Sequence, residues 1–388
     1  MLSYFKVWPF GVTPEKHAGI WADRRNLYDE LNYLLTNFAE RKRSFIQPLW
    51  GYLGAGKTHA IWHFGNLFQK KGKVKFIYSK FPIHAKNFYQ LYTDGFIPSF
   101  DFREFAELSS KLWKRLIANK DEEEAFFFIR EKIANRNDDF AQVIYNVAKM
   151  WSISPMKASR DPIFILSRMW LQGAKLGRGH LNAIGVARNI SNDSDAILAL
   201  GGIVRLFTFE DDNENIHGLP IVWALDDSHV IFARPSKQQE EIQRGIRRMI
   251  DECPTKLLIL MSFATPDPEK IREGLIEELK TVASYSIIEI PPLTKDNALI
   301  FILDLINHED FRRQDAPSKF YPYTEKSIKR IIERIVEKGI DLLPRNIIKC
   351  FEHLTDEAQK EKREIIDIEF VDKFFNNKCL SEFCSLLA

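Results

Sequence analysis

The chain has 388 residues, of which 45% are hydrophobic, so it is long enough for two or three domains with ordinary globular cores. Its 55 Lys and Arg nearly balance its 53 Asp and Glu, and this balance favours neither nucleic acid nor any other charged partner. No apolar run reaches the ~18 residues of a membrane helix, so no membrane association is expected. The four cysteines show no metal-site spacing and are too few for a disulfide scaffold, which predicts free thiols and a cytoplasmic location.

Residues 1–43 precede the first predicted strand. Within them, Leu27, Leu31, Leu34 and Leu35 recur at helical spacing and predict a helix over residues 20–38. Two basic residues, Arg24 and Arg25, stand near its start. They either lie over a bound base or form an exposed pair.

Residues 51–58 read Gly-Tyr-Leu-Gly-Ala-Gly-Lys-Thr, a complete G-x-x-x-x-G-K-[ST] phosphate loop. Its glycines let the backbone N–H groups point at phosphate oxygens, Lys57 can reach the β- and γ-phosphates, and the Thr58 hydroxyl can ligate Mg²⁺. The apolar run 45–50 predicts a strand before the loop, although Pro48 is unusual in a central strand. Residues 59–67 predict the following helix. The expected nucleotide-binding residues of this stretch are Gly51, Gly54, Ala55, Gly56, Lys57, Thr58 and His59.

A second strand is predicted over residues 73–78, and a long, mostly helical region follows at 88–209. This region contains a basic, glycine-rich stretch, residues 173–180, which includes Lys175 and Arg178. Such a stretch is either a mobile loop or a contact with nucleic acid or a neighbouring subunit.

An apolar run at 219–225 predicts a buried parallel strand that ends in Asp226 and Asp227. Two carboxylates at the end of a buried strand are costly unless they face a metal or phosphate site. Asp226 is expected to hold the Mg²⁺ shell, and Asp227 to orient or deprotonate the attacking water. The next buried strand, 257–263, places Ser262 beside the γ-phosphate, with Thr265 as the alternative. The sheet should close after a strand at 286–290, near residue 293.

Residues 294–388 are predicted to be helical, with helices over 297–306, 325–338 and 345–354. Gly339 ends one helix and Pro344 helps to start the next. Arg345 then points back across a domain cleft, or else makes only a surface ion pair. The apolar tail, 374–387, should pack on these helices or on a partner.

The chain resembles an AAA+ ATPase in four features and in their order. These are the phosphate loop, the strand ending in Asp226-Asp227, the strand ending near Ser262 and the Leu343-Pro344-Arg345 turn. The resemblance is to the branch of origin-recognition-type, STAND and transposition or secretion ATPases. It implies an α/β P-loop fold with a parallel sheet in the order 5-1-4-3-2, a helical insertion at about 88–209 and a helical lid. It also implies ATP and Mg²⁺ as ligands, with Asp227, Lys57, Ser262 and Arg345 in catalysis. The domains would be 1–43 near adenine, 44–293 as the ATPase core and 294–388 as the lid.

Three features depart from this pattern. Lys57 and Asp226 are 169 positions apart, which makes room for the insertion. Asp227 replaces the usual catalytic Glu and is one methylene shorter, which predicts slow hydrolysis. No Arg precedes the last core strand as an arginine finger, so Arg272 or Arg248 would have to substitute, or a partner would have to activate turnover.

Three functions fit these features. The leading hypothesis is a nucleotide-dependent switch or assembly factor that oligomerises with other protein subunits in a DNA-handling or defence complex. The second is an ATP-dependent regulator of transposition or replication that binds duplex DNA through Lys175, Arg178 and the cluster at 41–43. The third is a nucleotide-stabilised scaffold with little hydrolysis.

Overall fold

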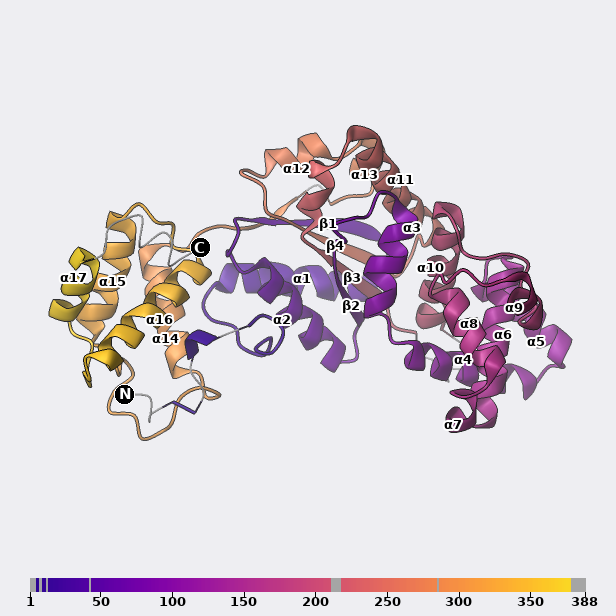
Figure 1. The fold of residues 1–388 in the computed structure, drawn as a ribbon, viewed down its shortest axis with the longest axis horizontal. Coiled ribbons are helices and arrows are strands. Elements are labelled where there is room, and N and C mark those ends of the chain that lie inside the picture. The colour runs from indigo at the N-terminus through magenta and orange to yellow at the C-terminus, as the bar shows by residue number, and fades with distance from the viewer. Residues whose placement is uncertain are drawn as a thin grey trace.

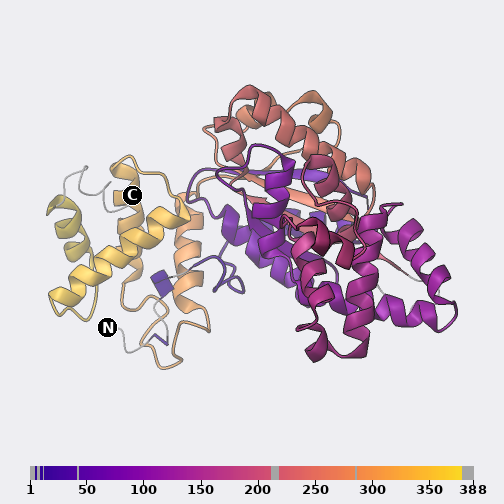
Figure 2. The same cartoon turned by 45° about the vertical axis from the view of Figure 1, so that its right-hand side comes forward.

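The computed structural model describes residues 5–6, 9–11, 13–41, 43–210, 218–284 and 286–377. The molecule is elongated, with a sheet and its covering helices in the middle (Figure 1). Helices α14–α17 lie at one end and helices α4–α9 at the other. Figure 2 shows that the two ends remain on opposite sides of the sheet after a turn of the view.

The sheet contains five strands, which are β1 (Phe45–Gly51), β2 (Lys75–Lys80), β3 (Ile221–Asp226), β4 (Leu257–Phe263) and β5 (Ile288–Ile290). All of their pairings are parallel, in the order β2-β3-β4-β1-β5. This confirms the predicted 5-1-4-3-2 order. Strands β3 and β4 are buried along their whole length, as continuous apolar runs in a doubly covered sheet require.

Pro48 is tolerated because β5 is short. Strand β5 pairs with β1 only from Leu49 onward. The N–H of Ile46 points to that side, where it donates to the Val282 carbonyl, so the nitrogen of Pro48, two positions on, faces the same side. The Gln47 amide occupies the gap and donates to the carbonyl oxygens of Pro48 (2.9 Å) and Ser286 (2.8 Å). No ladder hydrogen bond is therefore lost at Pro48.

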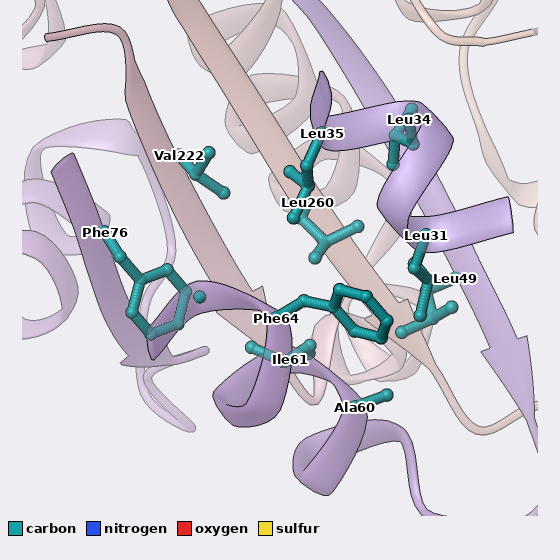
Figure 3. A pocket seen from close by; sticks show the side chains of 11 residues that line it. Leu31, Leu34, Leu35, Leu49, Ala60, Ile61, Phe64, Phe76, Val222 and Leu260 are labelled. Carbon is teal, nitrogen blue, oxygen red and sulfur yellow. The ribbon is translucent and has the colours of Figure 1, made fainter. Parts of the chain in front are cut away.

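Helices α1 (Arg25–Arg41) and α2 (Lys57–Lys70) cover one face of the sheet. Figure 3 shows side chains of both helices, such as Leu31 and Phe64, meeting Val222, Leu260 and Leu49 of the strands. The space left among them is about 10 Å³ and is lined by apolar side chains, so this layer is a packed core and not a ligand site. Helix α1 begins at Arg25, because Asp23 (φ 54°) and Arg24 (φ 58°) are left-handed, so the helix predicted from residue 20 was wrong over its first five residues.

The region 88–209 is built of helices on the opposite face and beyond the sheet edge. They are α3 (Phe88–Gln90), α4 (Phe102–Ile117), α5 (Glu122–Phe128), α6 (Asp138–Ile153), α7 (Pro155–Ala158), α8 (Pro162–Leu171), α9 (Arg178–Ala183) and α10 (Asp193–Thr208). Side chains of Asn, Asp or Ser cap most of their starts; Asp161, for example, accepts from the N–H groups of Ile163 and Phe164. Three further helices, α11 (Ser236–Glu252), α12 (Glu269–Gly274) and α13 (Glu277–Lys280), complete this layer.

The C-terminal helices are α14 (Lys295–Asn307), α15 (Glu325–Glu337), α16 (Pro344–Lys360) and α17 (Ile368–Asn377). The first three were predicted within a few residues, and α17 was not. They form their own apolar core, into which Phe10 and Ile20 of the N-terminal segment insert. None of the helices in the described ranges has the length and apolar character needed to span a lipid bilayer. Cys253 and Cys350 are buried free thiols, whereas Cys379, Cys384, Lys42 and the tail beyond residue 377 lie outside the described residues.

Candidate functional site

The phosphate loop connects β1 to α2 and is held open by two left-handed glycines, Gly54 (φ 86°) and Gly56 (φ 100°). Lys57 begins α2 and is buried beneath the loop. Its ammonium donates to the carbonyl oxygens of Gly51 (2.8 Å) and Tyr52 (3.0 Å). Burial lowers the pKa of Lys57, and the nearby Asp226 and Asp227 carboxylates offset part of that shift. An anion in the loop would give this buried ammonium a stronger acceptor than two carbonyls.

Asp226 is the most enclosed acid of the site, with 1% of its surface exposed. One carboxylate oxygen accepts from the Thr58 hydroxyl (2.7 Å) and the Tyr78 phenol (2.9 Å), and the other accepts from the Ser262 hydroxyl. These three donors compensate the burial of the carboxylate and fix its orientation. Burial and the adjacent Asp226 raise the pKa of Tyr78. No sequence pattern indicated a role for Tyr78 in the site, because a Tyr in an apolar strand is normally a core residue.

Asp227 lies beside Asp226 but faces the other way. Its backbone is left-handed (φ 58°), and its N–H donates to the Ser262 oxygen at 3.0 Å. Its carboxylate lines the cavity described below and has no hydrogen bond or ion pair within the described ranges. The two acids therefore occupy different positions, one fixed below the loop and the other open to the cavity.

Ser262 is fully buried, and its hydroxyl is shared between Asp226 and the Asp227 backbone. The structure thus places it beneath the two acids and not among the residues that line the cavity. The alternative, Thr265, also lies outside the lining and donates to the Asp267 carbonyl at 2.8 Å. Ser262 is placed to position Asp226 and Asp227, which differs from the expected contact with a phosphate.

A cavity of about 650 Å³ opens above the phosphate loop, a size typical of small-molecule sites. Four parts of the chain line it: the N-terminal segment, the loop with the start of α2, the ends of β2 and β3, and helices α14 and α16. Polar groups are contributed by Lys57, Thr58, Asp227, Arg345 and Glu352, and apolar surface by Phe10, Ile20, Trp21, Phe301, Leu305 and Ile348. The cavity therefore combines a charged part with an apolar part, as a nucleotide requires.

The guanidinium of Arg24 joins the N-terminal segment to the loop. It donates to the Ala55 carbonyl (2.9 Å) and to the Pro291 carbonyl (2.9 Å). Burial lowers the pKa of Arg24 to about 10. The expectation of an exposed pair is wrong for Arg24, because only Arg25 is exposed. Arg24 lines the cavity, so its contact with a base stays a prediction. The sequence could not reveal the two hydrogen bonds of Arg24, because both acceptors are backbone carbonyls from distant segments.

His59, predicted to bind nucleotide, lines the cavity one turn into α2. Its ring lies parallel to the indole of Trp21, with centroids 6.1 Å apart, and its Nε2 is 3.3 Å from the His17 carbonyl oxygen. Burial lowers the pKa of His59 to about 4, so the imidazole is neutral at physiological pH. A neutral imidazole beside an indole gives the cavity an uncharged wall that can still form hydrogen bonds.

Arg345, at the start of α16, reaches the phosphate loop. Its N–H donates to the Gly54 carbonyl at 3.3 Å. A Cβ atom on Gly54 would lie 2.9 Å from the Cβ of Arg345, so this approach requires glycine at position 54. No ion pair of the Arg345 side chain is found in the described part of the chain, and the side chain lines the cavity. By contrast, Arg248 and Arg272 lie on α11 and α12 outside the cavity, where Arg272 pairs with Glu269.

The described structure resembles solved nucleotide-binding proteins over nearly its full length. The ORC2 protein of Aeropyrum pernix, in its ADPNP–ADP complexes, superposes with a TM-score of 0.50 at 12% identity, covering 97% of this chain and 73% of that chain. This chain therefore shares the P-loop fold of that protein, with five parallel strands and a phosphate loop between β1 and α2.

Two further solved structures are similar at lower scores. Cdc6p from Pyrobaculum aerophilum gives a TM-score of 0.47 at 14% identity, covering 89% of this chain and 66% of that one. Domain III of the Thermotoga maritima replication initiation protein DnaA gives 0.40 at 9% identity, covering 92% and 95%. The chain therefore spans about two thirds of the Cdc6p length. No protein-family model and no curated protein matches the sequence.

Proposed function

We propose that this AAA+ protein is an ATP-binding switch that assembles with other protein subunits when ATP joins its C-terminal helices to its core. The observation that carries this proposal is the position of Arg345, on the C-terminal helices, against Gly54 of the phosphate loop. A nucleotide bound there would contact both parts of the molecule, so its affinity would differ between open and closed arrangements. We assign residues 1–43 to an adenine-proximal segment, 44–293 to the ATPase core and 294–388 to the lid.

The residues present fit a magnesium ion. The Thr58 hydroxyl oxygen is 2.7 Å from a carboxylate oxygen of Asp226, and Asp227 is nearby. The available metal ligands are therefore hydroxyl and carboxylate oxygens. Mg²⁺ prefers such oxygens and usually takes one or two carboxylates together with substrate phosphates. When bound, the ion would neutralise phosphate charge. Thr58 would be its direct ligand, and Asp226 would hold its shell.

The remaining residues supply the chemistry of slow hydrolysis. Lys57 would leave its two carbonyl acceptors for the β- and γ-phosphates, and Arg345 would add a second cation. Asp227, which is free in the cavity, would accept a proton from the attacking water or orient it. Ser262 keeps Asp226 and Asp227 apart and correctly oriented, so we assign it a positioning role. The short Asp227 side chain and the lack of an arginine at residues 280–285, just before β5, favour slow or partner-stimulated turnover.

Glu352 extends the site along α16. The cavity-lining residues Arg345, Ile348, Lys349 and Glu352 are spaced as one face of a helix, which puts Glu352 about 10 Å from Arg345 along the axis. A carboxylate is repelled by phosphates, and Glu352 has no hydrogen bond or ion pair in the part of the chain that the structure describes. We assign it to the ribose hydroxyls, with the adenine between the N-terminal segment and α14. The neutral His59 and Trp21 contribute to that wall.

A second candidate function, an ATP-dependent DNA-binding regulator of transposition or replication, is favoured by one observation. Lys175 and Arg178 are exposed, and neither has a hydrogen bond or ion pair among the described residues. Cations free of protein partners are available to phosphates. In this case ATP-dependent assembly would require duplex DNA.

The test is the mass of wild type and Lys57→Ala by light scattering, each with and without ATP–Mg²⁺, and then with duplex DNA. The switch predicts that wild type assembles with ATP and with a non-hydrolysable analogue, and that Lys57→Ala never does. Assembly only with DNA would favour the regulator. An unchanged mass in every condition, with ATP bound, would contradict both and leave a nucleotide-stabilised scaffold.

A further inference from the structure

A second hollow lies at the far end of the molecule from the nucleotide site. It is a groove of about 540 Å³ between the start of α4, the end of α6 and α8. Figure 1 shows these helices on the opposite side of the sheet from α14–α17. Its apolar lining consists of Phe100, Phe102, Trp151, Phe164, Ile165 and Met169. Any occupant of this groove would leave the nucleotide cavity accessible.

The apolar surface of the groove continues into solvent. Ile165 and Met169, one turn apart on α8, are 40% and 39% exposed. Ile153, at the end of α6, and Met156, on α7, are 71% and 76% exposed. Contiguous exposed apolar side chains around a groove mark an interaction site in soluble proteins. We call these four residues together with the groove the α8 surface.

The α8 surface carries an excess of positive charge. The groove is lined by the cations Arg103 and Arg168 and by one acid, Asp101, whose carboxylate caps α4. Along residues 140–192 there are seven Lys and Arg and one acid, Asp161, whose carboxylate caps α8. The guanidinium of Arg168 lies 5.7 Å from the centre of the Phe102 ring in the groove. Lys157 and Arg160, beside the groove residue Ser159, are exposed and have no hydrogen bond or ion pair from their side chains within the described ranges. These cations are not neutralised by the described residues.

We propose that the α8 surface binds an amphipathic helix of a partner protein, with an apolar face in the groove and acidic residues along its flanks. The combination of aromatic side chains, Met and Arg is typical of the centres of protein–protein interfaces. The exposed Ile and Met side chains match an apolar helix face, and a sugar–phosphate backbone offers them no complementary surface. The unpaired Lys157 and Arg160 complement carboxylates on the helix flanks. This proposal does not depend on nucleotide binding.

The test uses a fluorescein-labelled peptide of roughly 18 residues, about five helical turns, with Leu and Phe on one face and Glu on the other. Fluorescence anisotropy measures its Kd for the full chain, in parallel with a peptide carrying Lys in place of Glu. We expect Met169→Asp to weaken binding of the Glu peptide at least tenfold, and the double change Lys157→Glu, Arg160→Glu to weaken it several-fold. The Lys peptide should not bind. Phe127→Asp, at an exposed apolar position on α5 outside the groove, is the control and should leave the Kd unchanged.

Three results would overturn the proposal. The Glu peptide could fail to bind, or bind Met169→Asp as well as wild type while circular dichroism shows both folded. A labelled single-stranded oligonucleotide of the same length could bind more tightly and depend on Lys157 and Arg160 but not on Met169, which would make the surface a nucleic-acid site. Light scattering could show a nucleotide-independent dimer that Met169→Asp dissociates, which would make the occupant a second copy of this chain.

Discussion

The backbone N–H of Arg345 donates to the carbonyl oxygen of Gly54, 3.3 Å away, although the two residues are 291 positions apart in the chain. Arg345 lies in the first turn of α16, and Gly54 lies at the left-handed turn of the phosphate loop. The C-terminal helices therefore touch the loop itself. A change in the loop on binding phosphate would reach α16 through this contact, which is the physical basis of the proposed switch.

Replacing Arg345 by Ala should weaken ATP binding by roughly 10- to 100-fold, because a hydrogen bond to a charged group contributes about 1.5–3 kcal/mol. The affinity for ADP, which lacks the γ-phosphate, should fall less. Isothermal titration with both nucleotides measures the difference. Lys360→Ala, at the exposed end of the same helix, is the control and should bind as wild type does. Equal losses for ATP and ADP would place Arg345 away from the γ-phosphate.

Asp227→Asn should lower the rate of phosphate release by about 10²- to 10⁴-fold, because the amide cannot accept a proton from water. Asp227→Glu should raise the rate above wild type, since the added methylene brings the carboxylate closer to the attacking water. ATP affinity should change little in either variant. If the Asn variant hydrolyses ATP as wild type does, Asp227 is not the base.

Acid should destabilise the fold through His59. Burial lowers its pKa to about 4 in the folded chain, whereas the unfolded chain takes up a proton below the ordinary value of 6.5. The unfolded state thus binds more protons between these values, and the free energy of unfolding falls as the pH drops from 7 toward 4. By pH 5 the loss is about 2 kcal/mol from this residue. Burial also lowers the pKa of His63, which adds in the same direction.

The measurement is urea unfolding at pH 7 and pH 5, for wild type and His59→Gln. The variant should lose about 2 kcal/mol less over this interval than wild type does. The same pH dependence in both proteins would show that His59 is not buried as a neutral imidazole.

Glu352→Gln should reduce the preference for ATP over 2′-deoxy-ATP, which we expect to be about tenfold in wild type, because a carboxylate is a stronger acceptor for a hydroxyl than an amide. Competition against a fluorescent ATP analogue measures both affinities. Glu357→Gln, on the same helix but outside the cavity, should keep the preference. A wild-type protein that binds both nucleotides equally would remove the ribose assignment.

The sequence by itself determined the sheet and the centre of the candidate site. Continuous apolar runs predicted β3 and β4 to within two residues, because strands buried on both faces must be apolar throughout. The other three strands have mixed patterns and were also predicted to within a few residues. The phosphate loop could be read directly, since glycine, lysine and threonine at fixed spacing are needed wherever backbone N–H groups hold a phosphate. The predicted closeness of Asp226 to Thr58 follows from the common edge at which parallel strands end.

Only the tertiary structure decided the contacts between segments that are distant in sequence. No local sequence pattern predicts three of these contacts, because a single polar residue in a strand or helix can have many different partners. They are Tyr78 with Asp226, Arg24 with the Ala55 carbonyl, and Glu352 in the cavity wall. The hydrogen bond from the Asp227 N–H to the Ser262 oxygen depends on how the chain turns after β3, and the left-handed Asp227 sets that turn. The groove along α8 forms where helices α4, α6 and α8 meet. It could not be predicted from the sequence, because helical periodicity predicts each helix but not which helices pack together.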